Sequence, residues 1–317
     1  MDDQVWDLVI IGAGPAGLSA AIYAAREHLS TLIFEHKTVG GMVASTDKLD
    51  NYPGFENGVG GLELADKMKA QAKKYGAKIG LAQVVGLESS LETKLVHLAN
   101  GQSVRARSVL IASGNDYRHL DIKGEAEMIG KGVHFCATCD AAFYKDRVVI
   151  VIGGGNSALE ETVYIAKFAA KIEIVSLTEL TATPAIQAEI KPFIESGKVV
   201  IHTLVNSLEI MAEKGQVTGV KGQRVDTKEP VEIAGAGIFV FVGLIPNTSF
   251  LKSSTVDLDD QGFVLADDNN QTSIAGVFVA GDVKSGATHQ AVVASGDGVV
   301  SALAIGRYLQ YNKDSNK

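Results

Sequence analysis

Cysteine is scarce in this chain of 317 residues: it has two, and they stand three positions apart at Cys136 and Cys139. A disulfide stabilises a fold mainly by closing a long loop, and this pair would close almost none. The spacing therefore argues against a structural disulfide. A C-x-x-C pair in a cytosolic chain is read first as a redox pair.

Positive charge is also in short supply. The chain has 29 Lys and Arg against 37 Asp and Glu, a formal net charge of -8, and no basic stripe. This excludes an ordinary nucleic-acid binder. The N-terminus lacks the basic start of a signal peptide, and no apolar run approaches the ~20 residues that span a bilayer. We therefore expect a cytoplasmic protein with no nucleic-acid partner and no membrane span.

Glycine, by contrast, is abundant at 34 residues and clusters after apolar runs. A strand expected over 5–11 leads into a glycine turn, a helix over 15–28 and a strand over 31–35, which is a βαβ unit. The same order returns in a strand over 147–153, a helix ending near 170 and a strand over 171–176. Further elements are expected as strands over 237–243 and 276–282 and a helix over 289–309.

The repetition predicts an α/β fold with two Rossmann-like three-layer (ββα) nucleotide-binding domains, the second inserted into the first. The expected boundaries are 1–117 and 246–317 for the first domain and 118–245 for the inserted one.

The first glycine motif is Gly12-x-Gly14-x-x-Gly17, between a strand and a helix. In such a motif the first glycine allows the tight turn, the second lets the backbone approach a pyrophosphate, and the third lets helix and strand pack closely. The helix N-terminus then offers N–H groups to the phosphates. Glu35, at the end of the next strand, can accept both ribose hydroxyl protons.

The second motif, Gly153-x-Gly155-x-x-Ala158, lacks the usual specificity residue, because Ser176 stands where an acid is expected. A 2′-phosphate would require arginine nearby, yet residues 176–190 contain no Lys or Arg. Two interpretations stay open. The turn holds a nicotinamide dinucleotide weakly, for example NADH through Glu179, or it keeps the fold and has lost its ligand.

The cysteine pair lies in the stretch from His134 to Asp140. C-x-x-C geometry lowers thiol pKa values, and one cysteine can resolve the mixed disulfide that the other forms. Asp140 follows directly and could shuttle a proton. The alternatives are an inert buried pair, or part of a metal site with His134, Cys136 and Cys139 as ligands. Because no other cysteine exists, we expect no metal.

Together these residues resemble the low-molecular-weight thioredoxin reductases over nearly the whole chain. The matching stretches are GAGPAGLSAAIYAAR near the start, Gly40-Gly41, Asn51-Tyr52-Pro53-Gly54, Ala112-Ser113-Gly114, CATCD at 136–140, GGGNSALEE at 153–161, Pro246-Asn247-Thr248, AGDV at 280–283 and His289-Gln290-Ala291. CATCD in this setting is specific, whereas each glycine motif alone is not.

The resemblance implies FAD in the two-segment domain, a nicotinamide-type inserted domain that carries the C-x-x-C, a homodimer and domain rotation. It implies that Cys139 lies nearest the flavin, that Cys136 attacks thioredoxin or a thioredoxin-like protein, and that Asp140 is the acid–base partner. The implied cofactor-binding residues are Gly12, Gly14, Pro15, Ala16, Gly17, Glu35, Gly41, Met42, Asn51, Val85, Ala112, Gly114, Gly281, Asp282, His289, Gln290 and Ala291.

The departures from the family pattern concern the electron donor. The family's His-Arg-Arg…Arg cluster for NADPH aligns with Ser176, Leu177, Thr178 and Ala182. Met42, Ala141 and His289 also replace the family's glutamine, glycine and arginine. The chain therefore resembles the deeply rooted or ferredoxin-dependent flavin thioredoxin reductases.

We expect electrons from ferredoxin, flavodoxin or another carrier. The alternatives are an FAD-dependent dithiol oxidase that uses oxygen and a non-enzymatic flavin redox sensor. A further hypothesis is that a C-terminal tyrosine, Tyr308 or Tyr311, stacks on the flavin.

Overall fold

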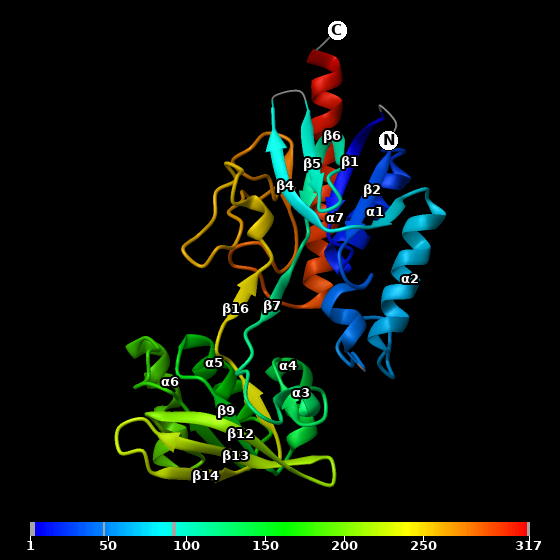
Figure 1. Cartoon of the computed structure of the whole chain (residues 1–317). Helices are drawn as coiled ribbons and strands as arrows, with labels where there is room; N and C mark the ends of the chain where they lie inside the picture. The colour runs from blue at the N-terminus through cyan, green and yellow to red at the C-terminus, as the bar shows by residue number, and fades with distance from the viewer. Residues whose placement is uncertain (1–3, 47, 91–92, 316–317) are drawn as a thin grey trace. The chain divides into compact units, whose positions relative to one another are not determined.

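The computed structural model describes residues 4–46, 48–90 and 93–315, and the chain divides into two compact units. Unit 1 comprises residues 1–116 and 245–317, and unit 2 comprises residues 117–244 between them. Figure 1 shows unit 2 mainly in green and unit 1 in the colours of the two chain ends. Two short strands at the crossings, β7 (Asn115–Tyr117) and β16 (Leu244–Pro246), pair with each other.

Unit 1 is built on a sheet with the strand order β3-β2-β1-β6-β5-β4, to which β17 is added beside β6. Strands β3, β2, β1, β6 and β17 are parallel, and β4 and β5 are antiparallel to their neighbours. Its elements are β1 (Val5–Ile11), α1 (Pro15–Arg26), β2 (Thr31–Glu35), η1 (Gly41–Ser45), α2 (Gly61–Lys74), β3 (Lys78–Leu81), β4 (Val84–Ser89), β5 (Lys94–Leu98), β6 (Ser103–Ile111), η3 (Ser249–Leu251), β17 (Val277–Val279) and α7 (Ala291–Ser315).

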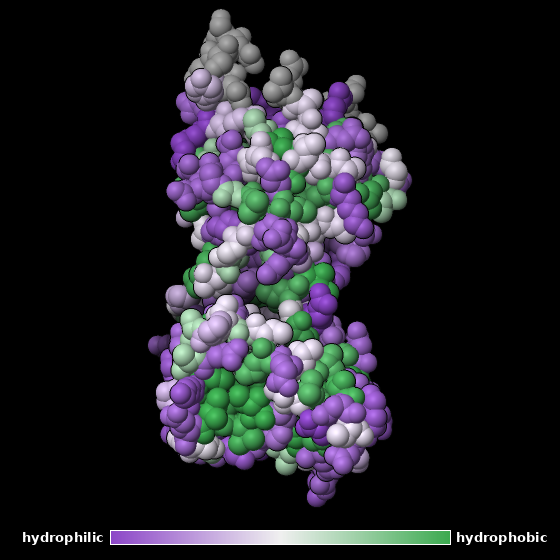
Figure 2. Space-filling view, turned by 90° about the vertical axis from the view of Figure 1, so that its left-hand side faces the viewer, coloured by the Kyte–Doolittle hydropathy of each residue, from purple (hydrophilic) through white to green (hydrophobic). Residues whose placement is uncertain are grey.

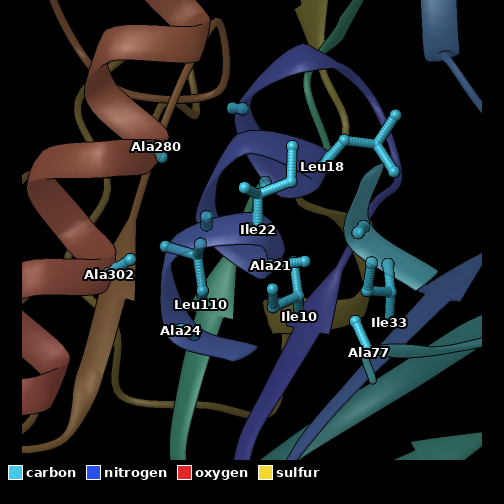
Figure 3. Packing of buried hydrophobic residues seen from close by; sticks show 14 of the residues in the cluster. Ile10, Leu18, Ala21, Ile22, Ala24, Ile33, Ala77, Leu110, Ala280 and Ala302 are labelled. Carbon is cyan, nitrogen blue, oxygen red and sulfur yellow. The ribbon is translucent and has the colours of Figure 1, made fainter. Parts of the chain in front are cut away.

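The two faces of this sheet follow the period-two alternation of its strands. On β1, Leu8 and Ile10 face one core and Val9 and Ile11 face the other. The first core is the α1, α2 and α7 side, and Figure 3 shows Ile10 with Leu18, Ala21 and Ile22 of α1 and Ala302 of α7. Burial of such aliphatic side chains contributes about 1.5–3 kcal/mol each.

Unit 2 repeats the plan with a five-stranded sheet, β11-β10-β9-β15-β8, whose pairings are parallel, and a three-stranded antiparallel sheet, β12-β13-β14. Its elements are α3 (Glu125–Met128), β8 (Val133–His134), α4 (Ala137–Asp140), η2 (Ala141–Tyr144), β9 (Val148–Ile152), α5 (Asn156–Ile165), β10 (Lys171–Val175), α6 (Pro184–Glu195), β11 (Val199–His202), β12 (Val205–Glu213), β13 (Gln216–Arg224), β14 (Pro230–Ala234) and β15 (Ile238–Val240). Hydrophobic residues gather on the face of unit 2 that Figure 2 shows.

Two separate cores make unit 2 a three-layer structure. Val149 and Val151 of β9 pack with the helices α5 and α6, while Ile150 and Ile152 pack with the antiparallel sheet. The predicted α/β class with two parallel-sheet nucleotide-binding units is confirmed.

Some expected boundaries were wrong. Helix α5 ends at Ile165 rather than near 170, because Lys167 and Phe168 donate to the carbonyls three residues earlier and tighten the chain into a turn. The strand expected over 237–243 is limited to Ile238–Val240. Gly243, with φ of +117°, lies outside strand geometry.

The expectation that no apolar run is long enough to span a membrane also needs correction. Within α7, Ala291–Tyr311 is long and apolar enough by composition. Ala302, Ile305 and Leu309 of this segment are buried in the same cluster as α1, whereas Val292, Val293, Val300 and Leu303 are exposed. One helix of this length and composition is weak evidence for a membrane span.

Helix α7 approaches α1 closely at Gly298, where a Cβ would strike the backbone carbonyl of Ala16. We therefore expect Gly298→Ala to lower the stability of unit 1 by about 1–3 kcal/mol through overpacking. Gly296→Ala on the same helix is the matched control, since a Cβ there meets nothing within 4 Å. It should raise stability by up to about 1 kcal/mol. Thermal unfolding of both variants measures the difference, and equal midpoints would contradict this packing.

Candidate active site

The first glycine turn has the close contacts that its sequence predicts. Gly12 has φ of +106°, and a Cβ there would strike the carbonyl of Ala112 at the end of β6. A Cβ on Gly17 would strike the carbonyl of Gly12, whereas a Cβ on Gly14 meets nothing within 4 Å. The turn is therefore packed at its first and third glycines and open at its second. An open second glycine is what a pyrophosphate needs.

Glu35 is buried at the end of β2 and binds three backbone amides. The N–H of Ala13 donates to Oε2 at 2.8 Å, and those of His36 and Lys37 donate to Oε1 at 2.9 and 2.8 Å. A carboxylate offers about four acceptor positions. One position remains for a ribose hydroxyl, rather than the two that the sequence suggested.

Segments from the two ends of the chain meet beside this turn. The Asn51 amide donates to Gln290 Oε1 at 3.1 Å, and the hydroxyls of Tyr52 and Ser295 lie 3.3 Å apart. Gly281 has φ of +73°, and a Cβ there would lie 2.9 Å from Ala16 Cβ. The structure thus brings Asn51, Gln290, Gly281 and the start of α1 together in unit 1.

Asp282 and His289 form an electrostatic pair in the same region. Burial raises the pKa of Asp282, the charge of Asp297 raises it further, and His289 acts in the opposite direction. His289 has φ of +31°, and its Nε2 is buried with no hydrogen-bond partner among the described residues. A buried polar atom of this kind needs a partner, which a bound cofactor would supply. These residues therefore fit a cofactor site.

The remaining residues of the predicted set lie in several settings. A Cβ on Gly41 would lie 3.3 Å from Gly14 Cα, and Gly114, with φ of +66°, faces open space. Met42 follows Gly41 in η1, Pro15 is the first residue of α1, and Ala291 is the first residue of α7. Val85 is 47% exposed at a register shift of β4.

The hypothesis that a C-terminal tyrosine stacks on the flavin stays a prediction, and the structure places both tyrosines near the far end of α7. Helix α7 continues without a break to Ser315. Tyr308 therefore lies about 26 Å along the helix from Ala291, since a helix rises 1.5 Å per residue. Its ring packs against Phe278 at a centroid distance of 6.0 Å. Tyr311 is one turn further on and is 73% exposed.

In unit 2, Cys136 and Cys139 form a disulfide with a Cα–Cα distance of 5.3 Å. Cys136 is the N-cap of α4, and the Cys139 N–H donates to Cys136 Sγ at 3.2 Å. Cys139 is exposed and Cys136 half-buried. Among the described residues, no group of three His, Cys, Asp or Glu side chains is arranged to hold a metal ion.

Asp140 contacts a histidine, which in turn contacts a tyrosine. His134 Nδ1 lies 3.2 Å from Asp140 Oδ2, and His134 Nε2 lies 2.7 Å from the Tyr144 hydroxyl. Burial, followed by the charge of Asp140, raises the pKa of Tyr144 to about 12. Sequence reasoning weighed His134 only as a metal ligand and missed Tyr144. The signal was present in the short spacing from the C-x-x-C to both residues.

The second glycine turn is packed by the loop that follows β10. A Cβ on Gly154 would clash with Ser176, which is buried. The N–H groups of Thr181 and Ala182 donate to the Gly154 carbonyl at 2.8 and 3.1 Å. The Thr183 N–H donates to Asn156 Oδ1 at 2.8 Å.

Comparisons with known proteins agree with these features. The family model described as pyridine nucleotide-disulphide oxidoreductase matches residues 6–298. The thioredoxin reductase of Bacillus subtilis (strain 168) is 36% identical over 317 residues, which cover 100% of this chain and 98% of the relative. The chain belongs to the thioredoxin reductase family.

Solved structures of the family have the same fold. The thioredoxin reductase from Streptococcus pyogenes MGAS5005 gives a TM-score of 0.91 at 34% identity and covers 98% of this chain and 100% of its own. That from Giardia duodenalis gives 0.91 at 32% identity, covering 97% and 100%. The chain is thus a thioredoxin reductase-like oxidoreductase, a flavoprotein that uses FAD and a redox disulfide.

Glu35 allows a test of the FAD cradle. Gln at this position presents an N–H₂ group toward backbone donors, so at least one charge-assisted hydrogen bond is lost. We expect Glu35→Gln to weaken FAD binding about tenfold or more. The control is Glu63→Gln, a change at a largely exposed carboxylate that pairs with Lys67. The ratio of flavin to protein absorbance after dialysis measures retention, and equal ratios would contradict the assignment.

Proposed function

We propose that this chain is an FAD-dependent thioredoxin-disulfide reductase that passes electrons to the Cys136–Cys139 disulfide and on to thioredoxin or a thioredoxin-like protein. The observation that carries the proposal is the closed disulfide, which has an amide N–H on Cys136 Sγ and Asp140 directly after it. Bound FAD would supply a two-electron reductant. The glycine turn, Glu35, Asp282 and His289 would hold it in unit 1.

The two cysteines have different roles in this proposal. An N–H donor stabilises a thiolate more than a thiol, so the Cys139 amide favours negative charge on Cys136 once the disulfide opens. Cys136 is then the sulfur that attacks the disulfide of thioredoxin, and Cys139 resolves the mixed disulfide and faces the flavin. Asp140 exchanges the proton.

The electron donor in this proposal is not NADPH. Two facts support this: the loop at 176–190 carries no Lys or Arg, and buried Ser176 packs on Gly154. Arg224 acts on Glu179 electrostatically, but its Nε and Nη2 donate to the Asp226 carboxylate, at 2.9 and 2.8 Å. This contact holds the pKa of Asp226 at about 2. A carrier such as ferredoxin or flavodoxin would supply the electrons instead.

We also propose a cytoplasmic homodimer. The exposed face of α7 supports self-association, because several aliphatic side chains on it meet solvent. They are Val292, Val293, Val300 and Leu303.

Anaerobic titration tests the donor. We expect NADPH to leave the flavin largely oxidised, while a reduced ferredoxin or flavodoxin bleaches it. Rapid, complete bleaching by NADPH would overturn the donor proposal. Peroxide formation on addition of a small dithiol in air would favour a dithiol oxidase instead.

A gain-of-function variant tests whether the missing arginines explain why NADPH does not reduce the flavin in this proposal. Leu177 and Thr178 are exposed, so arginine fits at both without disturbing the core. Leu177→Arg/Thr178→Arg should speed flavin reduction by NADPH about tenfold through charge-assisted bonds to the 2′-phosphate, and leave reduction by NADH unchanged. Leu208→Arg, at an exposed position of β12, is the control. An equal gain in both variants, or none in the first, would contradict the account.

A further inference from the structure

Asp140 is one end of a chain of three side chains that lies wholly within unit 2, the other two being His134 and Tyr144. His134 is the last residue of β8, Asp140 ends α4, and Tyr144 ends η2. The two short helices turn the chain back on itself, which brings the tyrosine hydroxyl to one ring nitrogen and the carboxylate to the other. The distances are 2.7 Å for Tyr144 Oη to His134 Nε2 and 3.2 Å for His134 Nδ1 to Asp140 Oδ2.

The surroundings hold the imidazole ring in place. His134 lies 5.3 Å from the Phe239 ring and 5.3 Å from the Tyr144 ring, between centroids, and Phe239 and Tyr144 contact each other edge to face at 5.6 Å. The His134 side chain is 10% exposed and that of Asp140 is 26% exposed. The chain thus runs from a buried hydroxyl to a carboxylate that meets solvent.

The chemistry of the partners sets the tautomer of His134. An ionised carboxylate only accepts hydrogen bonds, so an attractive contact with Asp140 needs the proton on Nδ1. Nε2 of the neutral ring is then an acceptor, and the Tyr144 hydroxyl, whose pKa of about 12 keeps its proton in place, donates to it. The two contacts require the same tautomer and therefore reinforce each other.

We propose that His134, fixed by Tyr144, is a positioning residue that holds the Asp140 carboxylate oriented for proton exchange with the cysteine pair. The inference rests on the proposed dithiol–disulfide chemistry. A cysteine thiol gives its proton to Asp140 and attacks the substrate disulfide, and Asp140 returns a proton to the sulfur that leaves. His134 and Tyr144 transfer no proton in this step.

The other charged groups around the three side chains lie on neighbouring elements. Arg147 lies 6.0 Å from the Tyr144 ring centroid and lowers the tyrosine pKa against the effect of burial. Helix α5, which packs on α4 and η2, carries Glu160 and Glu161. These groups are unchanged in the variants below, so a shift between variants reports on the three side chains.

Substitution of His134 by asparagine or by glutamine tests the two contacts of the imidazole separately. Asn carries its N–H₂ group near the position of Nδ1, and Gln carries its own near that of Nε2. His134→Asn therefore keeps a donor for Asp140, and His134→Gln removes it. Tyr144→Phe keeps the ring packing against Phe239 and removes only the hydroxyl that fixes the tautomer.

The experiment measures the pH dependence with which the dithiol-reduced holoenzyme reacts with a small aromatic disulfide, by stopped flow after removal of excess reductant. A donor to the ionised form lowers a carboxyl pKa, so its loss moves the acid limb of the profile to higher pH. We expect a shift of about one pH unit in His134→Gln, a smaller shift in the same direction in Tyr144→Phe, and the wild-type limb in His134→Asn.

An unchanged acid limb in both His134→Gln and Tyr144→Phe would overturn the proposal, as would an equal fall in rate at every pH. Flavin content and thermal midpoints confirm that the variants are folded. The small disulfide requires neither thioredoxin nor an electron donor. A wild-type enzyme that fails to reduce thioredoxin but shows the predicted shifts would refute the proposed function and leave this inference standing.

Discussion

Unit 1 depends on close backbone contacts at glycines, where a Cβ atom would clash. Gly17 lies against the carbonyl of Gly12, Gly12 against that of Ala112, and Gly298 of α7 against that of Ala16. The first two contacts fix the turn that leads into α1, and the third fixes α1 against α7. The N-terminus of α1 is thereby directed at the open side of Gly14, where an anionic group can meet its N–H groups. Glu35 stabilises the same turn by accepting a hydrogen bond from the backbone N–H of Ala13.

In unit 2, the residues around the disulfide are held mainly by side-chain packing. Its chemistry lies in residues 133–144, in which a two-residue strand and two single-turn helices follow one another from β8 to η2. Short elements of this kind have little stability of their own. Their side chains are held by the buried rings of Phe239 and Tyr144 and by the central sheet below them. Rigid packing behind a partly exposed sulfur pair lets the reactive atoms face solvent without losing their geometry.

The sequence predicts the elements that depend on local rules. Both βαβ units could be predicted, because glycine turns after apolar strands restrict the backbone strongly. The number of acceptor positions left on Glu35 could not, since its three donors, the N–H groups of Ala13, His36 and Lys37, are backbone groups with no sequence signature. Tyr144 was missed because its contact with His134 exists only once η2 has turned the chain. The distance of Tyr308 from the start of α7 could not be read from its place in the sequence, because it depends on the unbroken length of that helix.

The central claim is that electrons move from the flavin to Cys136–Cys139 and then to thioredoxin, whatever the donor. Flavin absorbance measures this directly when photochemically reduced enzyme is mixed anaerobically with oxidised thioredoxin. The account predicts flavin reoxidation in the wild type and none in Cys136→Ser or Cys139→Ser. Reoxidation at the same rate in the serine variants, or its absence in the wild type, would contradict it.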